Sequence, residues 1–183
     1  MPQNYQRQTL TALPAHLHQE ARPVSPHHQP HSTQHHAWMR SALDLAPTAL
    51  ATGDVPIAAL VIHDDGAVVG RGVNRREADG DPTAHAELLA LREAAQTLGR
   101  WRLEDCTLVV TLEPCAMCAG ASVLARIPRV VLGAWDPKAG ACGSVMDVVR
   151  NPALNHWTEV HGDVLAEECG ELIREFFRGH RDR

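Results

Sequence analysis

The pattern of apolar and polar residues becomes regular only from Trp38 onward. Apolar positions then recur at roughly helical spacing, and Pro47 predicts that this first helix ends or kinks early. Residues 57–74 follow as two apolar runs on either side of a turn at residues 64–66, which is the pattern of a hairpin. The regular part of the chain is therefore expected to begin with a helix and two paired strands.

Helical and strand-like patterns alternate through the rest of the chain. Residues 84–99 predict a helix that stops at Gly99, and residues 106–113 predict a buried strand. Four more elements are expected: a helix over 115–127, a strand over 129–135, a weak strand over 157–163 and a terminal helix over 165–179. A hairpin that feeds β–α units implies helices on both faces of one sheet. We therefore predict an α/β protein with a three-layer α/β/α fold and a mixed sheet of about five strands.

The first 36 residues differ from everything that follows. They hold seven of the twelve histidines, five of the twelve prolines and six glutamines, with no sustained apolar period. Such a segment cannot bury enough surface to offset the entropy lost on ordering. Histidine tracts can bind metal, but these histidines are scattered, which favours a solvated tail. We predict a disordered extension over residues 1–36 and a single domain over residues 37–183.

Composition narrows the class of protein. Apolar residues make up 44% and charged residues 21% of the chain, which is typical of a globular domain. We find no apolar run long enough to span a membrane and no signal peptide, so we expect a cytoplasmic protein. The five cysteines show no disulfide framework. The net charge of -5 means that any polyanion must be bound by a local patch.

Cys115 and Cys118 stand out as a pair directly after a predicted strand. They are expected in the first turn of a helix, with Pro114 at its first position, so both sulfurs can point at one spot. The partial positive charge of a helix N-terminus favours the thiolates that bind metal. Alone, the pair fits a redox or structural role as well, because it supplies only two ligands of a zinc ion.

His85 and Glu87 mark the start of another predicted helix. Residues two apart lie on different faces of a helix, so the two side chains can converge only beyond its end. One imidazole and the thiolates of Cys115 and Cys118 leave a tetrahedral zinc position open for water, whose pKa the metal lowers toward ~7. Glu87 can then take a proton from that water and return it to a leaving amine.

The combination HxE and PCxxC, with 26 residues between Glu87 and Pro114, resembles the zinc-dependent nucleobase deaminases of the cytidine and deoxycytidylate deaminase superfamily. Within that superfamily, residues 37–181 resemble the bacterial tRNA-specific adenosine deaminases. The segments that carry this likeness are WMRSALDLA, DVPIAALV, GVNRREADGDPTAHAELLALR, TLVVTLEPCAMCAGA, RIPRVVLGAWDPKAGACGSVMDV and ELIREFFR.

The resemblance implies a cytidine-deaminase-like fold and one Zn²⁺ per chain on His85, Cys115 and Cys118, with Glu87 as the proton shuttle. It implies hydrolytic deamination of adenosine to inosine by zinc-activated water, at the wobble position of a tRNA anticodon, with an arginine tRNA as the expected substrate. It also implies a homodimer in which the helix that bears the two cysteines lies near the interface.

Further roles follow from the same resemblance. The nucleoside is expected to contact Asn74 and the backbone of Ala86, and the RNA loop to contact Asp136. Three apolar residues that would otherwise be assigned to the core are expected around the base, namely Val55 and Pro56 as pocket walls and Phe177 on the terminal helix.

This sequence departs from the family pattern at Ala58, where glycine is usual and the added methyl is expected near the pocket. It also departs at Trp135, where an aromatic ring next to Asp136 can stack on a base. The terminal segment is the best candidate for phosphate contact in this sequence. Its arginines are Arg174, Arg178, Arg181 and Arg183.

Two alternatives remain open at this stage. One is a deaminase of a free base or nucleoside, such as guanine, cytosine or cytidine. The other is a binding module with a structural zinc site, closed by a fourth thiolate from Cys106, Cys142 or Cys169, of which Cys142 is the most plausible. A structural site has no need of Glu87.

Overall fold

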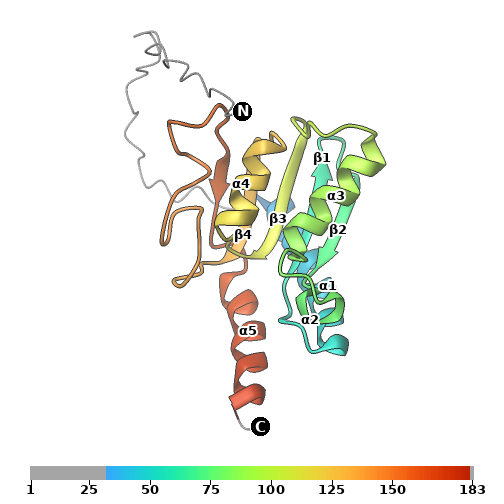
Figure 1. The fold of residues 1–183 in the computed structure, drawn as a ribbon, viewed down its shortest axis with the longest axis vertical. Coiled ribbons are helices and arrows are strands. Elements are labelled where there is room, and N and C mark those ends of the chain that lie inside the picture. The colour runs from blue at the N-terminus through green and yellow to red at the C-terminus, as the bar shows by residue number, and fades with distance from the viewer. Residues whose placement is uncertain (1–31, 182–183) are drawn as a thin grey trace, which may run out of the picture.

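The computed structural model describes residues 32–181, which form five strands and six helical segments (Figure 1). In chain order these are α1 (Thr33–Leu45), the 3-10 helix η2 (Ala46–Thr52), β1 (Ala58–His63), β2 (Val68–Val73), α2 (Arg76–Asp79), α3 (Ala86–Leu98), β3 (Cys106–Leu112), α4 (Ala116–Leu124), β4 (Arg129–Ala134), β5 (Glu159–His161) and α5 (Ala166–Arg181). None of the helices in this range is long and apolar enough to cross a membrane.

The start of α1 corrects one boundary. Residues 33–36 were expected in a disordered extension, but they form the first turn of α1. The Ser32 hydroxyl caps this turn by accepting a hydrogen bond from the backbone N–H of His35 at 3.1 Å, which offsets the weak apolar pattern of the turn. The rest of the predicted extension, residues 1–31, lies outside the part of the chain that the structure describes.

The other predicted elements are confirmed, with small differences at their ends. The helix interrupted by Pro47 passes into η2 after Leu45, and Gly99 ends α3 in a left-handed conformation. Pro114 does not occupy the first position of α4, because Cys115 is the N-cap with an extended backbone. The four-residue helix α2 was not expected, since its sequence is polar throughout.

The sheet is mixed and has the strand order β2-β1-β3-β4-β5. β1 pairs antiparallel with β2 and β3, whereas β4 pairs parallel with β3 and β5. Four chain segments therefore meet at one edge of the sheet: the entry to β1 and the exits of β2, β3 and β4. The residues expected to bind substrate and metal lie in these segments or follow them closely, except Phe177, which lies on α5.

Alternate residues of the strands enter two separate cores, which confirms the three layers. Ala59, Val61, Leu108, Val110, Val130 and Leu132 pack on the side of α3 and α4, and Leu60, Ile62, Val109 and Val131 pack on the side of α1 and α5. Figure 1 shows α3 and α4 in front of the sheet and α1 behind it.

Small residues bring α3 unusually close to the edge strand β2. A Cβ atom on Gly72 would lie 2.1 Å from the carbonyl oxygen of Ala86, and one on Gly70 would lie 2.2 Å from that of Ala90. Only glycine fits opposite the alanine face of α3 at this spacing. The contact fixes the position of the first turn of α3, and with it the side chains at the edge of the sheet.

Candidate active site

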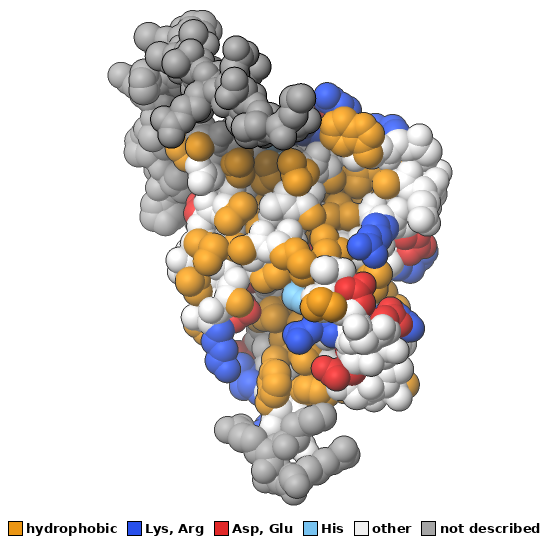
Figure 2. All heavy atoms as spheres, viewed as in Figure 1, with side chains coloured by type: hydrophobic (Ala, Val, Ile, Leu, Met, Phe, Trp, Pro, Cys, Tyr) orange, Lys and Arg blue, Asp and Glu red, His pale blue; other side chains and the backbone are white. Residues whose placement is uncertain are grey.

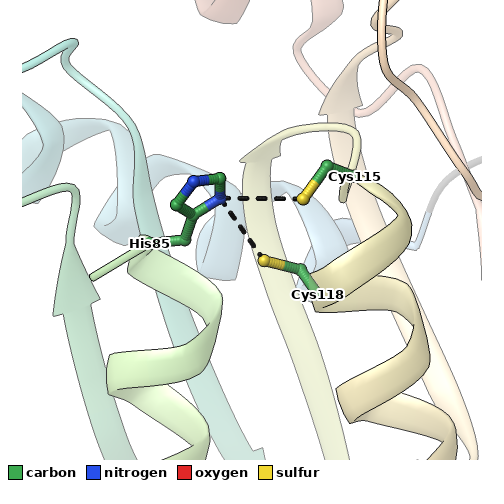
Figure 3. Close-up of side chains that lie close together, drawn as sticks. All are labelled: His85, Cys115 and Cys118. Carbon is green, nitrogen blue, oxygen red and sulfur yellow. Dashed lines mark hydrogen bonds between the residues drawn. The ribbon is translucent and has the colours of Figure 1, made fainter. Parts of the chain in front are cut away.

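The three predicted metal ligands come from the starts of two neighbouring helices. His85 is the N-cap of α3, Cys115 is the N-cap of α4, and Cys118 lies in the first turn of α4. Both helices lie on the same face of the sheet and contact each other. Figure 3 shows the His85 ring directed at both sulfurs across the gap between the helices.

The distances between these side chains fit a shared zinc ion. His85 Nδ1 lies 3.7 Å from Cys115 Sγ and 3.5 Å from Cys118 Sγ, and a nitrogen and a sulfur bound to one tetrahedral zinc are separated by about 3.6 Å at normal bond lengths. The ligating atoms of all three residues lie within 4.8 Å of one another. A single imidazole N–H cannot satisfy both sulfurs, whereas one cation between the three atoms can.

The cluster has three ligands and no fourth. Among residues 32–181, the group of side chains able to hold a metal contains only His85, Cys115 and Cys118. Cys142, the expected fourth thiolate of a closed structural site, is buried elsewhere. One zinc ion per chain therefore fits here with a coordination position left open, as in catalytic sites.

The two thiols are unequal in the absence of a cation. A hydrogen bond from Cys118 lowers the pKa of Cys115 to about 5. The pKa of Cys118 is raised, because its thiol is the donor in that hydrogen bond and is also buried. The thiol of Cys115 therefore loses its proton more readily than that of Cys118, and both would bind a zinc ion as thiolates.

Glu87 is only 4% exposed and lies in the first turn of α3. Burial is the main reason why its pKa is raised to about 7. A cation on the neighbouring ligands favours the carboxylate and acts in the opposite direction. Glu87 and His85 line the same cavity, so the two side chains do converge beyond the end of the helix.

This cavity has a volume of about 210 Å³ and opens at the edge of the sheet. It brings together most of the residues expected around the substrate. Its lining includes Val55, Asn74, Ala86 and Asp136, together with Ile57, Arg76, Leu112, Glu113 and Ala139, which the sequence did not single out.

Pro56 and Phe177 are not in the lining of this cavity. Pro56 is buried, and the N–H of Ile57 donates to the Val55 carbonyl at 2.8 Å, which places Pro56 at the apex of a three-residue turn. Val55 and Ile57, on either side of it, line the cavity instead. Phe177 lines a neighbouring hollow of about 460 Å³ that shares Val55, Asn74 and Arg76 with the cavity.

Asn74 is a buried polar residue in the lining of the cavity. It is 6% exposed, and its backbone N–H donates to the Ile57 carbonyl at 3.0 Å. No described residue forms a hydrogen bond with its side-chain amide, which leaves the donors and the acceptor of that amide available to a bound molecule.

Glu113 is the main residue of the site that the sequence analysis did not identify. Its buried carboxylate accepts hydrogen bonds from the backbone N–H groups of Asp136, Cys142 and Ser144 at 2.9, 2.9 and 3.1 Å, and from the Ser144 hydroxyl at 2.5 Å. Glu113 thereby ties the loop after β4 to the end of β3. The only signal in the sequence is an acidic residue that directly follows a buried strand.

Trp135 and Ala58 were also expected near the substrate, but neither lines the cavity. Trp135 does not line the cavity, because its indole N–H donates to Asp163 at 2.9 Å and its ring covers Gly162. Ala58 is fully buried in the sheet and does not line the cavity either.

Two arginines of the terminal helix, Arg174 and Arg178, form ion pairs with carboxylates of the same helix. Arg174 pairs with Glu167 and Glu171, and Arg178 pairs with Glu171. The side chains of Arg181 and Arg183 lie outside the part of the chain that the structure describes.

Comparison with known proteins agrees with this geometry. A family model described as the cytidine and deoxycytidylate deaminase zinc-binding region matches residues 32–134. A tRNA-specific adenosine deaminase of Bacillus subtilis is 46% identical over 151 residues, which cover 82% of this chain and 93% of that protein. A tRNA(Ile)-lysidine synthase of Deinococcus radiodurans is 52% identical over 151 residues, which cover 81% of this chain but only 25% of that protein.

Among solved structures, one from a study of A-to-I editing by tRNA:A34 deaminases at the wobble position of transfer RNA is similar to this fold. It has a TM-score of 0.71 and 40% sequence identity, and the match covers 74% of this chain and 98% of the other.

Proposed function

The chain belongs to the cytidine and deoxycytidylate deaminase family, and from this premise we propose that it converts adenosine to inosine at the wobble position of a tRNA anticodon. The observation that carries this proposal is the open three-ligand zinc site beside Glu87, at the edge of a small cavity. The likeness over nearly the whole length of a tRNA-specific adenosine deaminase supports the substrate class. Within that class, we propose an arginine tRNA, as the sequence resemblance implies.

The size of the cavity supports a single base as its occupant. Its volume of about 210 Å³ is below the ~300–1,000 Å³ typical of pockets for drug-sized molecules. Enzymes that modify a base in a nucleic acid take that base out of its stack into a pocket of this kind. The neighbouring hollow next to Phe177 is then available to the adjacent nucleotide.

The residues of the cavity divide into two roles. His85, Cys115 and Cys118 would hold the zinc ion, which lowers the pKa of a water molecule toward ~7. Glu87, which lines the cavity, would accept one proton of that water and deliver it to the ring nitrogen N1 of the base. It would then take the second proton from the hydroxyl that has been added at C6 and deliver it to the amine that leaves as ammonia.

The substrate-binding roles are assigned from the positions of the residues in the cavity and in the neighbouring hollow. The side-chain amide of Asn74 has no hydrogen-bond partner among residues 32–181, and the first N–H groups of a helix, such as that of Ala86, have no acceptor within the helix. These groups orient the nucleoside. Val55 contacts the base, Asp136 lies where the RNA loop passes, and Phe177 packs against the neighbouring base.

We also propose that the protein acts in the cytoplasm as a homodimer with α4 at the interface. α4 contains no charged residue, and its outer side chains Met117 and Leu124 are 37% and 69% exposed. Figure 2 shows hydrophobic side chains gathered over α4 and the neighbouring loops. A helix that is apolar all round is normally covered, and the resemblance implies a second copy as the cover. Sedimentation equilibrium tests this, and a monomer at micromolar concentration would contradict it.

The deciding experiment compares possible substrates directly. Zinc-loaded protein is incubated with a set of tRNA transcripts and, separately, with free guanine, cytosine, cytidine and adenosine. We expect inosine at the first anticodon position of one or a few tRNAs and no ammonia from the free compounds. Ammonia from free guanine or cytosine without inosine in any tRNA would refute the proposal.

A variant of Glu87 tests the mechanism. Glu87→Ala should retain one zinc per chain, since Glu87 is not a ligand, and should lose the ~10²–10⁴-fold that general acid–base catalysis supplies. Single-turnover rates on tRNA measure this loss, and metal analysis of the same sample provides the control. Turnover close to that of the original protein would show that Glu87 is not the proton carrier of the reaction.

A further inference from the structure

The charge of this protein poses a problem for a polyanionic substrate. Its net charge is -5, so RNA must be attracted by individual cations close to the site. Most arginines in the described part of the chain could bind an RNA phosphate only by giving up a carboxylate with which they already pair. Those in ion pairs with carboxylates are Arg40, Arg75, Arg100, Arg102, Arg129, Arg150, Arg174 and Arg178.

A few cations have no carboxylate within ion-pair distance in the described part of the chain. Arg71 and Arg92 are two of them, and they line a different hollow between β2 and α3. Lys138 is exposed but lines none of the cavities described above. Arg76 is the one that lines both the base cavity and the neighbouring hollow with Phe177.

The backbone that carries Arg76 is firmly held. Asp54 is fully buried, and its carboxylate accepts hydrogen bonds from the N–H groups of Glu77 at 2.8 Å and Ala78 at 3.1 Å. It also accepts one from the hydroxyl of Thr52 at 2.8 Å. These bonds tie α2 to the segment just before Val55, so the exposed Arg76 side chain starts from a fixed point at the mouth of the site.

Neighbouring charges distinguish Arg76 from the residues on either side of it. Arg75 is bound to the carboxylate of Asp79 by two hydrogen bonds at 3.0 and 2.7 Å. Glu77 also lines the hollow, and its side chain forms no ion pair within the described structure. The hollow is therefore lined by one cation without an ion pair, Arg76, and by two such carboxylates, the outer Glu77 and the buried Asp54, whose oxygens are already bound by N–H and hydroxyl groups.

We propose that Arg76 binds the phosphate that joins the flipped-out adenosine to the nucleotide seated in the hollow beside Phe177. A guanidinium is suited to this task because its planar donors match the oxygens of a phosphate. Glu77 opposes the same phosphate and moderates the affinity. The inference rests on the proposed function, because it requires an RNA chain at the site.

The test measures binding and turnover of an anticodon stem-loop that the original protein deaminates. Arg76→Gln should raise KM by about 5- to 10-fold, as expected for loss of one charge-assisted contact, with kcat within about twofold. The logarithm of the association constant for RNA decreases linearly with the logarithm of the salt concentration. The magnitude of this slope should be smaller by about 0.7 in the variant, which corresponds to one phosphate contact on a single strand. Glu77→Gln should change KM in the opposite direction.

Arg92→Gln is the matched control, because it removes the same charge from an unpaired, exposed arginine outside both hollows. It should leave the salt slope unchanged and alter KM much less. If Arg76→Gln behaves like Arg92→Gln while the original protein is active on tRNA, the role of Arg76 is refuted and the proposed function stands. If the original protein deaminates no tRNA, both proposals are wrong.

Discussion

Replacement of Glu113 by glutamine tests how the edge of the cavity is held. The substitution preserves the shape of the side chain but removes its charge and converts one acceptor oxygen into an NH₂ group. The two backbone N–H groups of Cys142 and Ser144 both point at Oε1, so the amide oxygen should take that place. The NH₂ group then occupies the position of Oε2.

At the position of Oε2 the NH₂ group meets one possible acceptor, the Ser144 hydroxyl, and one donor with which it cannot bond, the N–H of Asp136. It can donate to the Ser144 hydroxyl, whose own proton can turn to the Asp136 carbonyl 2.7 Å away. It cannot accept from the N–H of Asp136, which now bonds to Oε2 at 2.9 Å. The variant therefore leaves one backbone donor without its partner.

These changes give the expected magnitude. An orphaned donor costs about 1–3 kcal/mol, and two charge-assisted hydrogen bonds that become neutral lose about 1 kcal/mol each. The total is about 3–5 kcal/mol. Asp136 is only partly buried, so water can reach its N–H, and we expect a loss near 3 kcal/mol.

Urea unfolding at saturating zinc measures this loss, because a fixed metal concentration keeps the contribution of metal binding constant. Ser144→Ala is the matched control, since it removes one of the four hydrogen bonds and should cost about 1 kcal/mol. KM for tRNA should rise with Glu113→Gln, because Asp136 and Ala139 line the cavity. A loss in Glu113→Gln no larger than that in Ser144→Ala would refute the reasoning.

Two further predictions concern the zinc ligands and the packing of α3. Cys118→Ser should lower the zinc content from about one ion per chain and reduce stability, as mass spectrometry and thermal unfolding would show, and intact zinc would contradict the ligand assignment. Gly72→Ala should destabilise by about 1–3 kcal/mol, because its Cβ would meet the Ala86 carbonyl oxygen at 2.1 Å. Gly179→Ala, where the helix has open space, is the control and should stabilise by up to about 1 kcal/mol.

The order of the elements could be predicted because its signals are local. The DDG turn between two apolar runs requires only neighbouring residues, and β1 and β2 pair as expected. The end of α3 at Gly99 has the same origin. The start of α1 and the polar helix α2 were not predicted, because they depend on backbone hydrogen bonds that are accepted by the Ser32 hydroxyl and by the carboxylate of the distant Asp54.

The metal ligands could be identified because their chemistry is evident from residue type. Histidine and a cysteine pair at predicted helix starts have few other uses in this combination. The role of Glu113 could not be predicted in this way. Its partners lie more than twenty residues away in a loop without regular structure, and a glutamate after a strand has no distinctive pattern.

By itself, then, the sequence determined every element except α2 and the start of α1, together with the three ligands and the candidate proton carrier Glu87, since each depends on local patterns or on the chemistry of one side chain. Only the tertiary structure decided which cations are free, which residues line the cavity, and that Ile57 lines it where Pro56 was expected. The sheet brings together segments from different parts of the chain, and no local pattern records which of their side chains face the same cavity.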